Sequence, residues 1–308
     1  MKAVVIEEYG SADELKYKEA DDPKLKDHDV LIEIAATSVN PVDWKIREGY
    51  LREKLKYDFP LILGWDAAGV VKEVGPNVTD FQIGDEVFTR PDIQRSGTYA
   101  EYVAVDQSLV ANKPANLSFE EAASIPLIGL TSWQCLVDTT KITGGDRVLI
   151  HAGAGGVGSF AIQLAKAFGC WVATTCSTKN VDFVKELGAD QVINYEKEDF
   201  QDVLEAVDVV FDTLGGEIQE KSYHVLKKGG RLVSIAGVPD QQTAEKYEVK
   251  TDYVFMDPDG EELEKIGELL EQEKIRPIVG KVMPLSEIQE AHRLSETEHM
   301  RGKIVLKV

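Results

Sequence analysis

Cysteine is scarce in this sequence, and its few copies follow no ligand or redox motif. Three cysteines occur in 308 residues, and no two of them form a CxxC pair. In any disulfide scheme one of them would be left over, which is typical of reduced thiols in a cytoplasm. We therefore expect a cytoplasmic protein in which small buried thiols pack among apolar groups, at Cys135, Cys170 and Cys176.

Basic residues and long apolar runs are also in short supply. Lysine and arginine total 34 against 54 aspartates and glutamates, a formal net charge of −20. Nucleic acids and anionic membranes need a basic surface, so neither is expected as the main partner. No segment reaches the roughly 18 apolar residues of a membrane span, and the apolar run in the opening MKAVVIEEYG is too short for a signal peptide.

Histidine shows no metal-binding pattern either. The five histidines are scattered, without HExxH and without pairing to cysteine at zinc spacing. These spacings predict no metal site.

The chain is long enough for two domains, and the pattern of apolar residues and turn residues changes near residue 123. The first part has short β-like runs broken by Gly, Pro and Asp, which favour an irregular antiparallel β domain. Apolar strands then alternate with helical segments, which indicates a doubly wound parallel α/β sheet. The expected strands of this sheet are residues 147–151, 171–175, 191–194, 207–212 and 231–236.

Beyond this sheet, residues 261–274 have the spacing of an amphipathic helix. Residues 278–284 and 303–308 return to strand character. We expect the last segment to pair back onto the first domain.

A glycine-rich turn follows the first strand of the parallel sheet. Gly153, Gly155 and Gly158 form the GxGxxG pattern, and a helical segment starts near Val157. The three glycines allow a tight turn, close approach to a pyrophosphate and packing of helix on strand. With Gly156 they predict a dinucleotide-binding loop of the Rossmann type.

The residues about twenty positions further on indicate which dinucleotide binds. An NAD-binding domain usually has an acid there, whereas this chain has Ser177 and Lys179. A hydroxyl and a positive charge suit a 2′-phosphate, so we expect NADPH. The alternative is that Lys179 is only a solvated lysine.

Two further loops follow later strands of the same sheet. Ligands of open α/β sheets bind beyond the carboxyl ends of the strands, at the switch point. This places Leu214, Gly237 and Val238 near the ribose and nicotinamide. The glycines here are alternatively plain turn residues.

Several motifs occur in an order that resembles the medium-chain dehydrogenase/reductase superfamily, over nearly the whole chain. The closest resemblance is to its zinc-free quinone oxidoreductase and alkenal reductase branch. The carriers are residues 38–45 (SVNPVDWK), 63–71 (LGWDAAGVV), 84–87 (GDEV), 97–102 (GTYAEY), 152–158 (AGAGGVG) and 187–190 (LGAD), the last leading to Asn194 and Tyr195.

The resemblance implies a Rossmann domain inserted between two segments of a GroES-like β domain, with the active site in the cleft. The expected ranges are 1–122 and 269–308 for the catalytic domain and 123–268 for the NADP-binding domain. It also implies that Tyr195 lines the 2′-phosphate pocket with Ser177 and Lys179, although a strand-end aromatic is the alternative. Relatives are commonly homodimers, and by this analogy we expect one.

The chain departs from the zinc-dependent members at their ligand positions. Those members carry a cysteine where this chain has Asn40 and a His-Glu pair where it has Trp65 and Asp66. No four-cysteine lobe can be formed. Without a Lewis acid, reduction of an electrophilic quinone or enone is easier than oxidation of an unactivated alcohol. Hydride would pass from the nicotinamide, and donors would stabilise the enolate or quinol oxygen.

The resemblance places four candidate donors in the cleft. Asn40 is one, or else it caps a turn with Pro41. Lys45 hydrogen-bonds the carbonyl or relays a proton, or else it forms a salt bridge with a nearby aspartate, Asp43 or Asp66. Tyr50 is a candidate proton donor or a surface tyrosine, and Thr131 approaches the nicotinamide or packs a helix. Trp65 and Ile128 shape an apolar pocket or belong to the core.

The sequence therefore predicts an NADPH-dependent reductase of quinones or α,β-unsaturated carbonyl compounds. An enoyl-thioester reductase is the alternative within enzymes. A non-catalytic NADPH-binding sensor is the alternative outside them.

Overall fold

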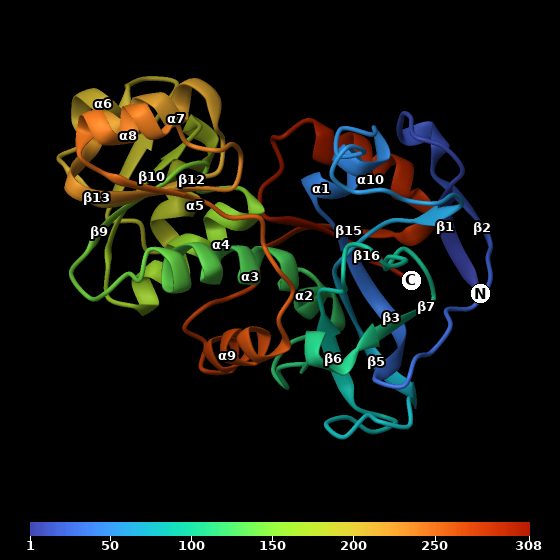
Figure 1. The fold of residues 1–308 in the computed structure, drawn as a ribbon. Helices are drawn as coiled ribbons and strands as arrows, with labels where there is room; N and C mark the ends of the chain where they lie inside the picture. The colour runs from blue at the N-terminus through green and yellow to red at the C-terminus, as the bar shows by residue number, and fades with distance from the viewer. The chain divides into compact units, whose positions relative to one another are not determined.

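The computed structural model describes residues 1–308, which form two compact units. The first comprises residues 1–127, 258–272 and 277–308, and the second comprises residues 128–257 and 273–276. In Figure 1 the red carboxy-terminal strands lie beside the blue strand β3, so both ends of the chain build the first unit.

The first unit contains two β-sheets. A three-stranded sheet has the order β2-β1-β4, and a larger one has the order β15-β16-β3-β5-β6-β8, with β7 also paired to β3. The bounds are β1 Lys2–Ile6, β2 Lys16–Glu19, β3 Asp29–Val39, β4 Leu61–Ile62, β5 Ala67–Val74, β6 Glu86–Thr89, β7 Tyr102–Asp106, β8 Val110–Asn112, β15 Val279–Pro284 and β16 Lys303–Lys307.

Strand β16 confirms the expected return of the chain end. It pairs antiparallel with β3, with Val305 opposite Ser38, and both of these residues are buried. The helices of this unit are α1 Pro41–Arg47, α2 Phe119–Ala123, α9 Gly260–Glu271 and α10 Ile288–Glu296. Helix α3, Pro126–Trp133, carries the chain into the second unit and continues as a π-helical turn over Gln134–Thr139.

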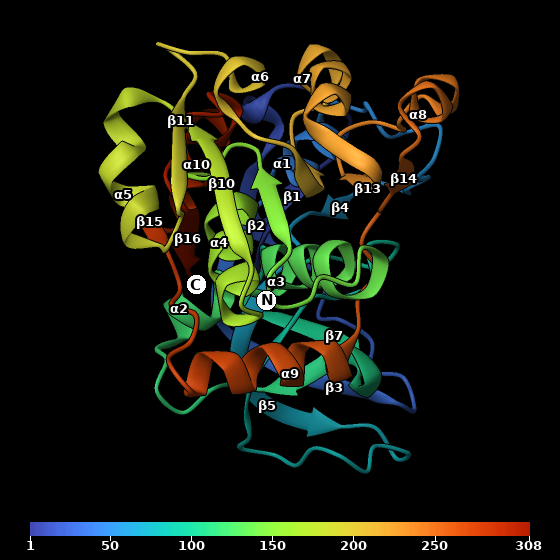
Figure 2. The same cartoon turned by 90° about the vertical axis from the view of Figure 1, so that its left-hand side faces the viewer.

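The second unit is a six-stranded parallel sheet with the order β11-β10-β9-β12-β13-β14. Figure 2 shows β11 and β10 at one end of this sheet and β13 and β14 at the other. Its strands are β9 Arg147–Ile150, β10 Trp171–Cys176, β11 Gln191–Asn194, β12 Val207–Asp212, β13 Leu226–Ser234 and β14 Lys250–Tyr253. Its helices are α4 Gly156–Ala167, α5 Val181–Glu186, α6 Phe200–Val203, α7 Gly216–Ser222 and α8 Gln241–Tyr247.

The sheet order confirms the doubly wound α/β fold. The chain moves outward from β9 through β10 to β11, then returns to the other side of β9 with β12. The switch point therefore lies between β9 and β12, and the glycine loop leaves β9 there.

The two units differ from the expected ranges in their boundaries. Residues 123–127 and helix α9 belong to the first unit. Gly260 explains the position of α9, because a Cβ on it would lie 2.6 Å from the carbonyl oxygen of Val110 at the start of β8. Residues 273–276 remain with the second unit, where Gln163 exchanges hydrogen bonds of 3.1 and 3.0 Å with the backbone of Arg276.

None of the helices has the length and apolar composition needed to span a bilayer.

Candidate functional site

The glycine loop joins β9 to helix α4. A Cβ on Gly153 would lie 2.1 Å from Oγ1 of Thr174, and one on Gly158 would lie 2.3 Å from the carbonyl oxygen of Ala152. These two glycines are therefore required by close packing. Gly155 differs, because a Cβ there would meet only the carbonyl oxygen of Ala152, at 3.4 Å.

Gly155 is also the residue that precedes the first turn of α4. Its position has no side-chain cap, so the first backbone N–H groups of the helix are not satisfied by a side chain. An anion is stabilised by such N–H groups and by the positive end of the helix dipole. The open space at Gly155, followed by Gly156 and Val157, fits a dinucleotide pyrophosphate.

Hydrogen bonds to strand β10 fix the conformation of the glycine loop. Ala152 has a φ of +52°, and its N–H donates to Oγ1 of Thr175 at 3.2 Å. The N–H of Gly153 donates to the carbonyl oxygen of Thr175 at 3.0 Å. The residue before the loop, His151, is fully buried, with Nδ1 3.2 Å from Oγ1 of Thr175 and Nε2 2.9 Å from Oγ of Ser222.

Burial lowers the pKa of His151 to about 4, so the ring is neutral. The hydroxyl of Ser222 donates to the carbonyl oxygen of Ile218 and therefore accepts from Nε2–H of His151. Nδ1 is then the acceptor for the hydroxyl of Thr175. This neutral histidine links the start of the loop to strand β10 and helix α7.

Three predicted residues lie where strands β10 and β11 end. The strands run parallel with Cys176 opposite Asn194, which places Ser177, Lys179 and Tyr195 at the same edge of the sheet. Ser177 is buried, with its Oγ 3.1 Å from the amide nitrogen of Asn180. Lys179 and Tyr195 are exposed.

The other predicted cofactor residues follow β12 and β13. Leu214 and Val238 are 52% and 73% exposed, and a Cβ on Gly237 would meet no atom within 4 Å. These groups leave room for a ligand at the edge of the sheet that also carries the glycine loop.

Asp212 organises the first of these loops and was missed by sequence reasoning. Its Oδ1 accepts from the N–H groups of Leu214 and Gly215 at 3.0 and 2.9 Å. Its Oδ2 accepts from Nε2 of Gln219 at 2.9 Å and from Oγ of Ser234 at 2.7 Å. All four bonds go to one fully buried carboxylate at the end of β12.

The same network fixes the second loop. Oγ of Ser234 accepts from the N–H groups of Ala236 and Gly237 at 3.2 and 3.3 Å. Gln219 donates to the carbonyl oxygen of Gly237 at 3.0 Å. One sequence signal could have revealed this network: Asp212 is an acid at the last position of a predicted parallel strand.

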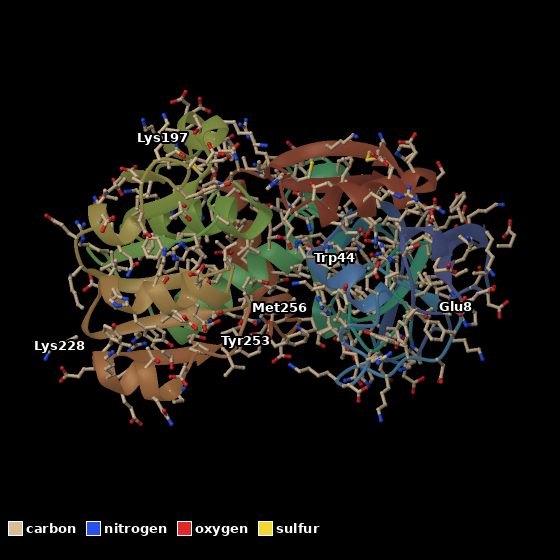
Figure 3. All side chains as sticks on the ribbon, turned by 90° about the horizontal axis from the view of Figure 1, so that it is seen from above. Glu8, Trp44, Lys197, Lys228, Tyr253 and Met256 are labelled. Atoms are coloured by element: carbon tan, nitrogen blue, oxygen red, sulfur yellow. The ribbon has the colours of Figure 1, made fainter.

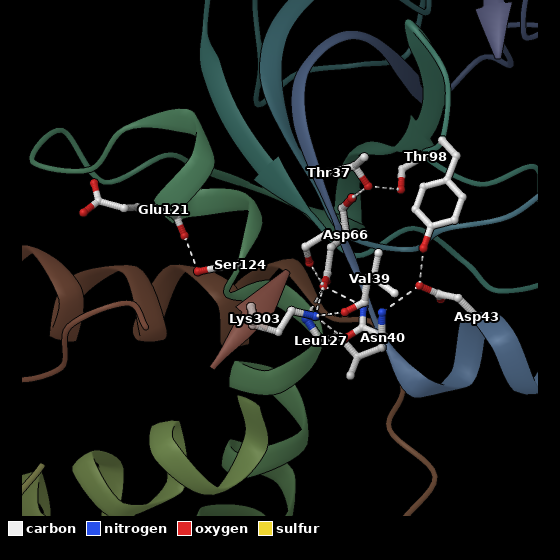
Figure 4. Close-up of polar contacts among 12 residues, drawn as sticks. Thr37, Val39, Asn40, Asp43, Asp66, Thr98, Glu121, Ser124, Leu127 and Lys303 are labelled. Carbon is white, nitrogen blue, oxygen red and sulfur yellow. Dashed lines mark hydrogen bonds and ion pairs between the residues drawn. The ribbon is translucent and has the colours of Figure 1, made fainter. Parts of the chain in front are cut away.

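In the first unit, Asn40 lies in a buried ionic network rather than at an open surface (Figure 4). Its Nδ2 donates to Oδ2 of Asp66 at 2.7 Å, and its Oδ1 accepts from Nζ of Lys303. Asp66 also accepts from Oγ of Ser38 and from the N–H of Leu127, both at 2.7 Å. Asn40 precedes α1, as the turn interpretation required, but both ends of its amide bond to Asp66 and Lys303.

Asp43 is the second buried carboxylate of this region. Its Oδ2 accepts from the hydroxyl of Tyr99 at 2.6 Å and from the N–H of Asn40 at 2.8 Å, while its Oδ1 has no partner. Complete burial raises the pKa of Asp43 to about 7, against the lowering effect of these hydrogen bonds. Behind Tyr99, Nδ1 of His292 lies 3.0 Å from the Arg47 guanidinium and Nε2 lies 3.3 Å from the Tyr99 hydroxyl.

Lys45 and Tyr50 flank the indole of Trp44, which is labelled in Figure 3. Nζ of Lys45 lies 5.5 Å from the ring centroid, and the Tyr50 ring packs edge-on at 6.4 Å. Both residues are exposed, Tyr50 by 69%. The alternative role for Lys45 was a salt bridge with Asp43 or Asp66. It pairs with neither, because both aspartates are fully buried while Lys45 is exposed, and Lys303 pairs with Asp66.

Trp65 and Thr131 are both buried. Trp65 is fully buried in the core of the first unit, which agrees with the packing interpretation. Thr131 is 4% exposed in helix α3 and belongs to the second unit, as does Ile128. Nowhere does the structure bring together three His, Cys, Asp or Glu side chains that could hold a metal ion.

Two protein families match parts of the chain. Residues 26–115 match the alcohol dehydrogenase GroES-like domain, and residues 187–306 match the zinc-binding dehydrogenase family.

Individual proteins match the chain from end to end. The chloroplastic NADPH-dependent alkenal/one oxidoreductase of Arabidopsis thaliana is 37% identical over 99% of this chain and 79% of its own length. The 2-methylene-furan-3-one reductase of Solanum lycopersicum is 39% identical over the same shares. The structure of the quinone oxidoreductase from Coxiella burnetii superposes with a TM-score of 0.94 at 39% identity, covering 100% of this chain and 99% of that one. In sequence and in fold, the chain therefore belongs to the quinone oxidoreductase branch of the medium-chain dehydrogenase/reductase superfamily.

Proposed function

We propose that the protein is an NADPH-dependent oxidoreductase that reduces quinones or α,β-unsaturated carbonyl compounds without zinc. The observation that carries the proposal is the loop at Gly155, where open space meets the uncapped start of α4. The Arabidopsis relative is named as an NADPH-dependent alkenal/one oxidoreductase, the tomato relative as a 2-methylene-furan-3-one reductase, and the Coxiella protein as a quinone oxidoreductase. We propose the chemistry that suits such compounds for this chain, which is hydride transfer to an electron-poor carbon.

The second unit would hold the cofactor along one edge of its sheet. Gly153, Gly155, Gly156, Val157 and Gly158 would bind the pyrophosphate. Ser177, Lys179 and Tyr195 would take the 2′-phosphate, and the two loops held by Asp212 would support the nicotinamide end through Leu214, Gly237 and Val238. Bound NADPH supplies the hydride.

The chain's own donors would handle the negative charge that develops on the substrate oxygen. Tyr50 and Lys45 are exposed beside Trp44 and have no salt bridge to Asp43 or Asp66, so we assign them proton donation and carbonyl binding. Asn40 is 1% exposed with both ends of its amide engaged, so we assign it a positioning role. Thr131, which is 4% exposed, is assigned to the nicotinamide because of the family resemblance.

The charge of Lys303 supports zinc independence. Its ammonium lies 3.1 Å from Asp66 and donates to Asn40, the residues at two positions where zinc-dependent members carry ligands. A divalent cation there would meet a buried positive charge. The quinone or enone can accept hydride without a Lewis acid because it is already electrophilic.

Three measurements test the proposal together. The first is the affinity of the protein for NADPH and NADH, and the second is NADPH oxidation with quinones, enals and enoyl thioesters. The third is the same turnover after exhaustive chelation. We expect tighter binding of NADPH, turnover with quinones or enals, and no loss on chelation.

Lys179→Ala should weaken NADPH binding roughly tenfold and leave NADH binding unchanged. The exposed Lys185 on α5 supplies a control, Lys185→Ala, which should change neither affinity. Equal affinities of the original protein for the two cofactors, or an unchanged NADPH affinity in Lys179→Ala, would overturn the 2′-phosphate assignment. Binding without any turnover would favour the sensor alternative, and turnover with thioesters alone would favour the enoyl-thioester alternative.

The homodimer and the cytoplasmic location are part of the same proposal. Light scattering coupled to gel filtration would measure a mass near twice 34.1 kDa if the dimer forms.

A further inference from the structure

An acidic residue reaches the end of strand β10 from the turn that follows the neighbouring strand, β11. Oε2 of Glu196 accepts from Oγ1 of Thr178 at 2.5 Å and from the N–H of Thr178 at 3.1 Å. Thr178 lies between Ser177 and Lys179, the residues assigned to the 2′-phosphate. Residues 177–181, directly after β10, include no acid, yet the fold supplies one at that place.

The position of Glu196 is built by Asn194, the last residue of β11. Nδ2 of Asn194 donates to Oγ1 of Thr178 at 2.8 Å, and its Oδ1 accepts from the N–H of Glu196 at 3.1 Å. One amide therefore joins the threonine to the turn that carries the glutamate. The Glu196 carboxylate is therefore held by two hydrogen bonds from Thr178, and its turn is fixed by Asn194.

The surrounding charges keep Glu196 ionised. Its hydrogen bonds from Thr178 lower the pKa of the carboxyl below its ordinary value, and the positive charges of Lys179 and Lys197 act in the same direction. Lys197, labelled in Figure 3, follows it in the same turn. The edge that would receive the 2′-phosphate thus carries an anion among its cations.

We propose that Glu196 determines how strongly the protein prefers NADPH over NADH, an inference that rests on the proposed function. A carboxylate beside Lys179 repels a 2′-phosphate and competes with it for the lysine charge and the donors of Thr178. The same carboxylate can accept a hydrogen bond from the 2′-hydroxyl of NADH, as acids do in NAD-binding domains. Glu196 therefore reduces the preference that Ser177 and Lys179 alone would give.

The test compares the ratio of the NADH to the NADPH dissociation constant in the whole protein and in Glu196→Gln. We expect the ratio to rise roughly fivefold at low salt, mainly through tighter NADPH binding, and to rise less at 0.5 M salt. Glu186→Gln removes the same charge from an exposed site on α5 and should leave the ratio unchanged.

Glu196→Ala provides a second variant, and thermal unfolding checks that each variant is folded. A ratio that is unchanged or lower in both Glu196 variants would overturn the inference, while NADPH binding by the original protein would still support the proposed function. If the original protein binds neither cofactor, the proposed function itself fails. An equal rise in Glu186→Gln would show a general charge effect and would also overturn the role of Glu196.

Discussion

Nζ of Lys303 lies 3.1 Å from Oδ2 of Asp66, and both side chains are almost completely buried. The first residue is in the last strand, β16, and the second directly precedes β5. Their ion pair, completed by Asn40 and Ser38, joins the carboxy-terminal strand to the amino-terminal part of the chain.

Breaking this pair should destabilise the fold strongly. Lys303→Met leaves the Asp66 carboxylate buried without its counter-charge, and we expect the free energy of unfolding to fall by about 3–5 kcal/mol. Lys307 is the matched control, because it lies in the same strand but forms an exposed pair with Glu120 at 2.8 Å. Lys307→Met should cost less than about 1 kcal/mol. Urea unfolding measures both, and equal losses would contradict a special role for the buried pair.

The loop glycines should separate folding from binding. Gly158→Ala places a methyl group against backbone and should destabilise the protein by about 1–3 kcal/mol. Gly155→Ala should change stability by about 0.5 kcal/mol or less but weaken NADPH binding roughly tenfold or more, because the methyl group would hold off the pyrophosphate. Gly144→Ala has a similarly open surrounding outside the loop and should change neither. Unaltered NADPH affinity in Gly155→Ala would remove the loop from the binding site.

Asp212 should act on cofactor affinity through the two loops that it holds. Asp212→Asn replaces one acceptor with a donor that faces other donors, and we expect NADPH affinity to fall roughly tenfold. Asp208 is at the other end of β12, where it accepts from Lys227 and from the N–H of Arg147. Asp208→Asn should lower the melting temperature without changing NADPH affinity. If both variants lose affinity equally, the effect is a general loss of stability.

Asp43 should give the protein a characteristic pH dependence. Its folded pKa of about 7 lies above its ordinary value of 3.8, so the folded state holds an extra proton between these values. The contribution of Asp43 to the free energy of unfolding therefore falls as the pH rises from about 4 to about 7, by at most about 1.4 kcal/mol per pH unit.

Asp43→Asn removes this titration, and its new amide nitrogen can occupy the place of Oδ1, which has no partner. The stability of the variant relative to the original protein should rise between pH 4 and 7 and stay constant above. The buried histidines His151 and His292 titrate in both proteins, so their contributions cancel in this difference. A difference that does not vary with pH, measured by urea unfolding, would contradict the raised pKa.

Local patterns determined the parallel sheet and its glycine loop. The strands from β9 to β13 and helix α4 have apolar runs and helical spacing that can be recognised in a short window. Strand β14 was not predicted, because Lys250–Tyr253 (KTDY) has only one apolar residue. It is a strand only through its pairing with β13. Helix α9 was expected, but its place in the first unit depends on a close approach of Gly260 to Val110.

The site divides in the same way. The sequence by itself determined the glycine loop and the strand ends that carry Ser177, Lys179, Leu214 and Gly237, because spacing along the chain encodes them. Only the tertiary structure decided that Lys303 bonds Asn40, 263 positions away, and that Glu196 returns an acid to the end of β10. The physical reason is that a buried charge needs a partner, and the fold can supply that partner from a distant position in the chain. Such pairings follow no regular spacing in the sequence.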